Sequence, residues 1–436
     1  MELTVLLGGF TLLLLIGTPV AFALGAATLA TVFYMDLPPV VVFQQLSSGM
    51  NVFSMLAIPF FVFAGDLMLR GKIADRLVAL ASAMVGHLRG GLGQVNIVAA
   101  TLFGGVSGSA VADASAVGGV MIPQMKARGY APDYAVNITA NAALIDLLIP
   151  PSHNMILYVI AAGGAISVAD LFTAGIIPGM VMMLTLMVVA WLVAIRRGYP
   201  REAFPGWVAL LRLAVAALPG LMLIVIIFAG VRSGIFTATE SACVAVIYAL
   251  LITLLVYRSL NWTGFLGAVG GAVRTTGMVM LIIGTATAFG WLMALLQVPA
   301  QTVAFMRGIT EDPIMTLLLI NVILLVLGTF MDMAPLIMIG TPIFLPVVKA
   351  LGMDPVQFGI VLIVNLGIGL ITPPVGPALF VACAVGKVSM WDATKTSGPF
   401  YVAMLIVLLV LVGVSVLFLF TVGDAFSDMV GGVFQD

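Results

Sequence analysis

The sequence predicts an all-α polytopic membrane protein built from two related halves that cross the bilayer in opposite orientations. Apolar residues make up 62% of the chain and charged residues only 8%, whereas about a quarter of the residues in ordinary globular domains are charged. Several uncharged apolar stretches approach the roughly 20 residues that a membrane-spanning helix requires. In addition, a residue pattern recurs 223 positions further along the chain.

The composition excludes several functional classes. The net charge is -1, and without a long basic run the chain does not suit nucleic acid. Cys243 and Cys383 lie far apart within apolar segments, so they are expected to be buried hydrophobes and not a disulfide or metal pair. The start of the chain lacks a basic region and an A-x-A-type cleavage site, so its apolar stretch is interpreted as a first span and not as a signal peptide.

The internal repeat involves prolines, glycines and a lysine. At an offset of 223 residues, segments 122–132 and 345–355 share four matched residues, namely Pro123/Pro346, Lys126/Lys349, Gly129/Gly352 and Pro132/Pro355. The same offset relates Gly105 to Gly328 and Pro150-Pro151 to Pro373-Pro374. Because proline is only about one residue in twenty, chance matching of four prolines is improbable, and a duplicated chain is expected.

The apolar segments give a predicted order of elements. Single spans are expected near 3–34, 52–69, 172–195, 213–231, 236–257, 275–296 and 398–422. Two further helices, 134–163 and 356–386, are expected to be interrupted by Pro-Pro. Five crossings therefore separate Pro123 from Pro346, an odd number that inverts the second half.

The basic residues predict the orientation. With a cytoplasmic N-terminus and a periplasmic C-terminus, only Arg232, Arg307 and Lys349 of the 17 basic residues fall outside the cytoplasmic side. This distribution follows the positive-inside rule.

Two segments are predicted to be re-entrant helical hairpins. Segment 92–124 starts and ends beside basic residues, and its legs of about 13 residues would be about 20 Å long, short of the ~30 Å hydrocarbon core. Its repeat partner, 314–348, is expected to enter from the opposite face. The preceding segments, 72–88 and 298–310, are predicted to lie along the membrane interface.

The two hairpin tips and the two Pro-Pro breaks are the candidate binding sites. Interrupted helices leave carbonyls that suit Na⁺ and amides that favour an anionic substrate group. The first candidate site comprises Ser107, Gly108 and Ser109 of a tip with Pro150, Pro151 and Ser152 of a break. The second comprises Gly328 and Asp332 with Thr372, Pro373 and Gly376.

At these motifs the sequence resembles a known family. The run from Gly105 to Tyr130, the segment 149–152 and the segments 354–359 and 369–376 look like the signature of the large membrane subunit (M subunit, DctM type) of TRAP (tripartite ATP-independent periplasmic) transporters. The resemblance covers essentially the whole chain. It implies an elevator-type carrier that imports organic acids such as dicarboxylates, sugar acids or sialic acid together with Na⁺ across the bacterial inner membrane.

The resemblance also implies partners and a division of the chain. The expected partners are a small four-helix membrane subunit (Q type) and a soluble periplasmic binding protein (P type), in addition to the lipid bilayer. The moving domain is expected to comprise 92–163 and 314–386. The scaffold is expected to comprise 1–91, 164–313 and 387–436.

The sequence departs from the family pattern at the first break. Asp146 stands where a glycine is expected, and His153-Asn154 stand where an apolar pair is expected. An acid at membrane depth is a functional-site candidate. Two hypotheses are therefore kept: these residues shape the substrate site, or Asp146 and His153 form a pair that locks the broken helix.

Other polar residues have two interpretations each. Asp113 and Asp332 lie near the tips, where each either caps a helix leg or contributes charge to the site. Asn365 lies in the second broken helix and either contacts substrate or bonds to a neighbouring helix.

Two rival functions were weighed. An intramembrane enzyme is disfavoured because the chain has only two histidines and no His-Glu-x-x-His motif. A passive channel is disfavoured because inverted repeats with paired hairpins favour alternating access.

Overall fold

The computed structural model describes residues 1–164, 166–201, 203–310 and 312–433. The side chains of Val106, Ser107, Arg307 and 416–433 lie outside the described part. The predicted role of the Ser107 hydroxyl therefore stays a prediction. Within the described residues the regular structure is entirely helical, and eight helices are long and apolar enough to cross a membrane. The prediction of an all-α polytopic fold is confirmed.

The N-terminal segment differs from the prediction. Residues 3–34 do not form one span; they form two helices, α1 (Glu2–Leu15) and α2 (Val20–Tyr34), which pack against each other. The chain turns at Gly17, whose φ of 89° is left-handed, and Pro19 then lacks the N–H that would continue a helix. The two helices have 14 and 15 residues, so each is about 21–23 Å long.

The remaining scaffold helices largely follow the prediction. Their bounds are α3 (Val40–Met50), a 3₁₀ turn (Phe53–Leu56), α4 (Ala57–Arg70), α5 (Ile73–Val85), α11 (Trp207–Arg232), α12 (Ala238–Leu251) with a π turn (Ile252–Val256), α13 (Trp262–Leu295) and α14 (Val298–Ile309). Helix α3 was not predicted. Helix α13 begins 13 residues before the predicted 275–296 span, so Arg274 lies within a helix and not at its start.

The two hairpins and two broken helices are matched pairs. The first hairpin is α6 (Gly91–Ser107) and α7 (Ala110–Ala127), followed by α8 (Pro132–Ala142), η2 (Ile145–Leu147) and α9 (His153–Ala161). The second is α15 (Pro313–Phe330) and α16 (Met333–Ala350), followed by α17 (Pro355–Leu370) and α18 (Pro377–Gly386). Helices α7 and α16 begin and end 223 residues apart, and the cis peptides Pro150-Pro151 and Pro373-Pro374 share this offset.

The hairpin legs are longer than predicted. They contain 17 or 18 residues, not about 13, because Gly104 and Gly105 continue α6 and the turn falls at Gly108 (φ 61°). In the second hairpin the turn falls between Phe330 and Met333.

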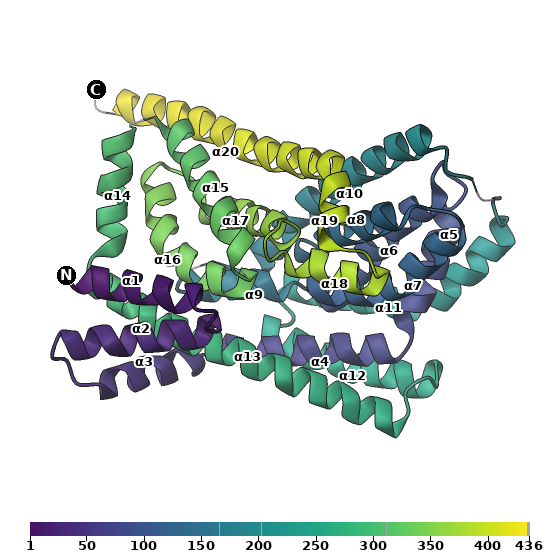
Figure 1. Ribbon diagram of the computed structural model, residues 1–436, viewed down its shortest axis with the longest axis horizontal. Helices are drawn as coiled ribbons and strands as arrows, with labels where there is room; N and C mark the ends of the chain where they lie inside the picture. Colours follow the sequence, from purple (N-terminus) through teal and green to yellow (C-terminus); the bar gives the residue numbers. More distant parts are fainter. Residues whose placement is uncertain (165, 202, 311, 434–436) are drawn as a thin grey trace.

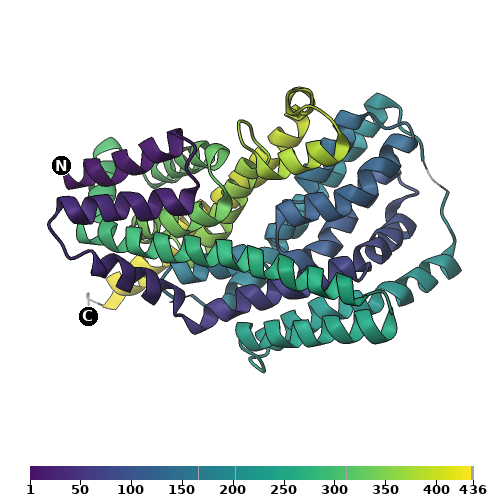
Figure 2. The same ribbon diagram turned by 60° about the horizontal axis from the view of Figure 1, so that its bottom comes forward.

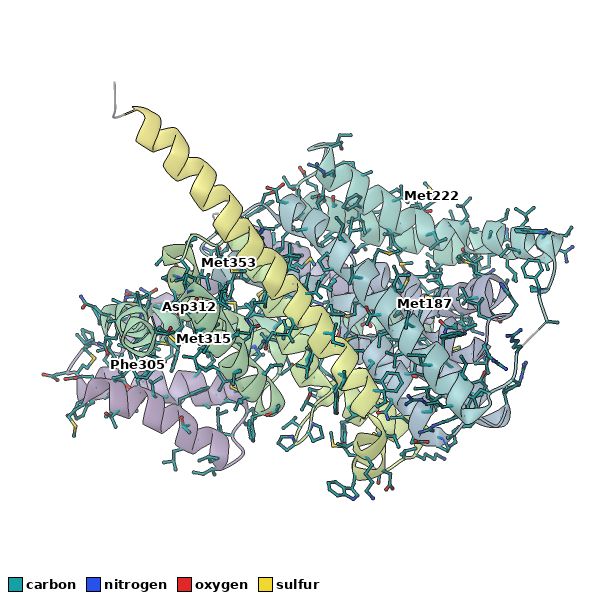
Figure 3. All side chains as sticks on the ribbon, turned by 90° about the horizontal axis from the view of Figure 1, so that it is seen from above. Met187, Met222, Phe305, Asp312, Met315 and Met353 are labelled. Carbon is teal, nitrogen blue, oxygen red and sulfur yellow. The ribbon has the colours of Figure 1, made fainter. Side chains whose placement is uncertain are left out.

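These elements lie between two sets of long helices. Helix α10 (Val168–Arg197) packs on α20 (Gly398–Val433), which follows the short α19 (Met390–Thr396). On the opposite side, α4 packs against α12 and α13. Figures 1 and 2 show the hairpins and broken helices between these two sets, and Figure 3 shows α20 crossing the molecule obliquely above them.

Polar bonds tie the two halves together at the ends of the hairpins and broken helices. Lys126 Nζ donates to the carbonyl of Gly386 at 3.0 Å, and Asn137 Nδ2 donates to the carbonyl of Ala393 at 2.9 Å. The Tyr158 hydroxyl donates to the carbonyl of Pro355 at 2.5 Å. The hairpins and broken helices of both halves therefore form one packed body.

Candidate functional site

A cavity of about 560 Å³ lies where the two tips and the two broken helices meet α4 and α13. The first tip and the following helix contribute Ser109, Ala110, Val111, Ala112 and Ser115, and the second contributes Asp332, Met333 and Ala334. The broken helices contribute Leu147, His153 and Asn154 from the first half and Leu370 and Val381 from the second. Helix α4 contributes Val62, Gly65, Asp66 and Leu69, and α13 contributes Thr275, Met278, Val279 and Ile282.

The first tip lies directly on the first break. A Cβ atom on Gly108 would lie 2.6 Å from the carbonyl oxygen of Pro151 and 3.2 Å from the backbone nitrogen of His153. The carboxylate of Asp146 accepts a 3.0 Å hydrogen bond from the backbone N–H of Ser109. It also fills the space beside Gly104, where a Cβ atom would come within 2.5 Å of Oδ1. A charged side chain therefore joins this break to this tip.

The second tip meets the second break through backbone alone. A Cβ atom on Gly369 would lie 2.5 Å from the carbonyl oxygen of Gly328. The backbone N–H of Val375 donates to the carbonyl of Thr329 at 3.2 Å. Gly376 has a φ of 43°, which begins α18 in a left-handed conformation. Asp146 of the first half corresponds to Gly369 here, so the side-chain bridge is replaced by direct contact of two glycines.

The predicted polar residues divide into two groups. Ser109, His153, Asn154 and Asp332 line the cavity. Asp113, Asp146, Ser152 and Asn365 are fully buried and are not among the residues that line it. The structure thus brings Asp146 against the tip, next to the cavity wall, and turns the neighbouring Leu147 toward the cavity.

The capping predictions have different outcomes. Asp332 is the N-cap of α16, where its Oδ1 accepts from the backbone N–H of Met333 at 2.8 Å. Asp113 does not cap α7, because Ser109 occupies the N-cap position and accepts from the N–H of Ala112 at 3.4 Å. Asp113 lies one turn inside the helix instead. Both of its oxygens are buried without a hydrogen-bond partner in the described structure, and its carboxyl lies within electrostatic range of Asp146.

Asn365 makes interhelical bonds. Its Nδ2 donates to the backbone carbonyl and the Oδ1 of Asn321 at 2.9 and 2.8 Å, which joins α17 to α15. In the first half Asn96 Nδ2 donates to Thr139 Oγ1 at 2.6 Å and joins α6 to α8 in the same way. These bonds fix each outer hairpin leg to its broken helix.

The scaffold side of the cavity was missed from the sequence. Asp66 lies on α4 and Thr275 on α13, both within segments predicted as plain spans. Asp66 sits against Gly271, where a Cβ atom would come within 2.3 Å of its Oδ2. A lone acid in a predicted span is a recognisable signal for a functional residue, so Asp66 was within reach of sequence reasoning.

The cavity is acidic on balance. Asp66 and Asp332 line it, whereas none of the described lining residues is Lys or Arg. The described residues also contain no group of three or more His, Cys, Asp or Glu side chains that could hold a metal ion. Any cation bound near the tips would therefore depend on backbone oxygens with single side-chain ligands.

A helical membrane protein with a cavity between two hairpin tips and two broken helices, where a few polar side chains interrupt an apolar lining, belongs to the class of membrane transport proteins. Residues 7–417 match the family described as "Tripartite ATP-independent periplasmic transporter, DctM component". The chain belongs to this family, the large permease subunits of TRAP transporters, and it is a transport protein and not an enzyme.

Individual relatives agree over nearly the whole length. The chain is 44% identical to the uncharacterised protein YgiK of Salmonella typhimurium, with 93% of each chain covered. It is 37% identical to the 2,3-diketo-L-gulonate TRAP transporter large permease protein YiaN of Escherichia coli (93% and 95% covered). It is 38% identical to the sialic acid TRAP transporter large permease protein SiaM of Vibrio cholerae (92% and 93% covered).

A solved structure shares the fold. The YdaH transporter of Alcanivorax borkumensis superposes with a TM-score of 0.62 at 14% sequence identity, covering 87% of this chain and 88% of that one. This likeness supports the architecture alone.

Proposed function

We propose that this chain imports a small organic acid together with Na⁺, and that the substrate binds in the cavity between the two tips. The observation that carries the proposal is that both halves contribute their tip and their broken helix to one cavity. The substrate class we infer is a dicarboxylate, a sugar acid or a sialic-acid-like compound, which is supported by the diketogulonate and sialic acid names of two relatives.

The charge of the cavity supports coupling to a cation. An anionic substrate entering beside Asp66 and Asp332, with no described Lys or Arg on the walls, is repelled unless cations enter with it. Backbone N–H groups and hydroxyls such as Ser109 would then hold the substrate carboxylate. Na⁺ would supply the positive charge that the lining lacks.

The first tip fits a cation. The buried Asp113 carboxyl has no hydrogen-bond partner in the described structure, and a bound cation would stabilise its ionised form. The carbonyl oxygen of Pro151 lies beside Gly108 at the same tip. The second site, at Gly328, Asp332, Thr372, Pro373 and Gly376, has a glycine at the position of Asp146, so backbone oxygens would act there with the Asp332 carboxylate.

The matched elements support opposite orientation of the halves. Between the two hairpins, from the end of α7 to the start of α15, lie the short α14, predicted to lie along the interface, and five other elements, namely the first broken helix, α10, α11, α12 and α13. If each of these five crosses the membrane once, the second half is inverted, and alternating access follows when the two-hairpin body moves against the scaffold.

The packing changes the boundary that we propose for the moving body. The sequence predicted 92–163 and 314–386 alone. Because α10 packs on α6 and α17, and α20 packs on α10 and α17, we infer that α10 and α20 move with the hairpins. The scaffold is then α1 to α5 and α11 to α14.

The N-terminal hairpin changes the proposed orientation. The sequence predicted a cytoplasmic N-terminus because 3–34 was read as one span. The α1–α2 turn brings the chain back, and in Figures 1 and 2 the N- and C-terminal labels lie at the same end of the long axis. We therefore propose that both termini face the periplasm of a bacterial inner membrane.

The name of the family implies three components. We propose that a periplasmic binding protein delivers the substrate and that a small four-helix membrane subunit packs on the scaffold.

Uptake into proteoliposomes tests the function. The chain is reconstituted with the small subunit and binding protein encoded beside it, and uptake of the acid that the binding protein retains is measured. We expect uptake to require an inward Na⁺ gradient and to stop when K⁺ replaces Na⁺. Uptake that is indifferent to Na⁺ would indicate a passive channel or another coupling ion.

A further inference from the structure

A second cavity, of about 510 Å³, lies away from the transport cavity where two interdomain linkers meet the surface of α10. The linker 86–90 joins α5 to α6, and the linker 198–206 joins α10 to α11. We call this cavity the linker groove. It is lined by His87, Leu88, Arg89, Gln94, Leu184, Met187, Val188, Trp191 and Arg201.

The floor of the linker groove is apolar and faces outward. Leu184, Val188 and Trp191 follow one another at helical spacing along α10 and are 55%, 55% and 46% exposed. Because α10 is long and apolar enough to cross a membrane, we expect the exposed side chains on it to contact hydrocarbon. Figure 3 shows Met187, which lies between these residues in sequence, on the same helix.

The end of the groove that the two linkers form has the features of a membrane interface. Arg89 and Arg201 come from the two linkers, and both belong to the predicted cytoplasmic set of basic residues. His87 packs edge-on against Phe204 with ring centroids 5.4 Å apart, and Phe204 packs on Trp207 at the same distance. Aromatic residues of this kind gather at the level of lipid headgroups.

Gln94 brings a hydrogen-bond acceptor to the groove. Its Nε2 donates to the carbonyl of Met187 at 2.9 Å, while its Oε1 is buried and has no hydrogen-bond partner in the described structure. The side chain is 2% exposed and lines the groove. An unpartnered buried oxygen accepts a hydrogen bond, so it calls for a ligand that has a hydroxyl or an N–H to donate.

We propose that the linker groove binds one anionic phospholipid with a polyol headgroup, of the phosphatidylglycerol class. The phosphate lies between Arg89 and Arg201, which together neutralise it. A hydroxyl of the headgroup donates to Gln94 Oε1. One acyl chain lies along the exposed apolar face of α10. A soluble anion would satisfy the arginines but would leave the apolar floor uncovered.

The position gives this lipid a role. It bridges the two linkers that join the hairpin body to the scaffold, and Gly90, in the first linker, already packs against Ala194 of α10. A lipid that binds both linkers would favour the linker conformations in which Arg89 and Arg201 lie close enough to share its phosphate. This inference concerns lipid binding and does not depend on the identity of the transported acid.

Native mass spectrometry of the detergent-purified protein tests the site. Matched acyl chains are presented as phosphatidylglycerol, phosphatidylethanolamine and phosphatidic acid. We expect one tightly retained phosphatidylglycerol per chain, and roughly tenfold weaker retention in the double variant Arg89→Gln/Arg201→Gln. The control Arg212→Gln removes an exposed charge on the same predicted side outside the groove, and it should retain the lipid as the parent does.

Two further measurements distinguish phosphatidylglycerol from other phospholipids and from free phosphate. Gln94→Leu should reduce the preference for phosphatidylglycerol over phosphatidic acid, because phosphatidic acid has no headgroup alcohol. Equal retention of phosphatidylethanolamine, unchanged binding in the double variant, or displacement of the lipid by inorganic phosphate at equal concentration would overturn the proposal.

Discussion

The two tip–break contacts occupy equivalent places in the repeat but are built differently. In the first half, the Asp146 carboxylate accepts from the Ser109 N–H and fills the space beside Gly104. In the second half, Gly369 lies against Gly328 with no side chain between them. The difference teaches that the repeat preserves the contact between a tip and a break, and that either a buried carboxylate or bare backbone can make it.

The largest effect is expected from adding a methyl group to the second contact. In Gly369→Ala the new Cβ would lie 2.5 Å from the Gly328 carbonyl oxygen and 2.7 Å from its Cα. Backbone atoms cannot rotate away as a side chain can, and overpacking typically costs about 1–3 kcal/mol. We expect at least a tenfold loss of the uptake rate and a lower apparent unfolding temperature.

The matched control for that prediction is Gly270→Ala. This residue lies within α13 with open space around its Cβ position, and alanine favours a helix over glycine by about 1 kcal/mol. Wild-type uptake in Gly369→Ala would show that the two glycines are not in tight contact.

The next largest effect is expected when Asp146 is replaced by glycine, the residue at the equivalent position 369 of the second half. Asp146→Gly removes the acceptor for the Ser109 N–H, a loss of about 1–3 kcal/mol for a buried group. Because Asp146 does not line the cavity, we expect slower uptake of every substrate with an unchanged order of preference among competing acids. Competition assays with a panel of acids measure this. A changed order of preference would support direct contact between Asp146 and the substrate.

A smaller effect is expected from the bonds that join the outer legs to the broken helices. Asn365→Ala removes two bonds to oxygen acceptors of Asn321, whereas Asn96→Ala removes one bond to the Thr139 hydroxyl and a weaker one to the sulfur of Met125. At about 1 kcal/mol per bond, Asn365→Ala should lower the apparent unfolding temperature in detergent more than Asn96→Ala does. The reverse order would show that the first half depends more strongly on its interhelical bond.

The smallest effect is expected from an ion pair found only in the first half. Arg197 pairs with Asp133 through two bonds of 3.3 and 3.0 Å, and both side chains are partly exposed. We expect Arg197→Gln to cost at most about 1 kcal/mol, and less in high salt. Thermal unfolding with and without 1 M NaCl measures this, with Arg212→Gln as the control. A large, salt-independent loss would contradict a surface role for the pair.

Much of the fold was predictable because bilayer crossing demands long apolar segments and the repeat fixes equivalent positions. The offset between Pro150-Pro151 and Pro373-Pro374 correctly located both breaks. The α1–α2 turn was missed because Gly17, Thr18 and Pro19 lie between two equally apolar stretches, and hydropathy alone does not separate a hairpin from a span. Hairpin leg lengths were underestimated because glycines were taken to mark the turn, whereas Gly104 and Gly105 remain helical.

The site was predictable in part. The tips and breaks followed from the repeat, but which side chains face the cavity did not, because a broken helix changes direction at the break. One hypothesis placed both Asp146 and His153 at the substrate site, yet His153 lines the cavity and Asp146 does not. Asp66 could have been recognised as a lone acid within a predicted span, whereas Thr275 was missed because its place at the cavity depends on tertiary packing that no local motif encodes.

The central claim is that both tips face one substrate cavity, and cysteine protection tests it most directly. Val111 and Ala334 are equivalent by the repeat and both line the cavity. Each is changed to Cys in a background with Cys243 and Cys383 replaced by Ser, and Lys395→Cys on the exposed surface of α19 serves as the control. With Na⁺ and the transported acid present, alkylation at positions 111 and 334 should slow by a similar factor while position 395 is unaffected. Protection of only one tip, or of neither, would contradict a shared cavity.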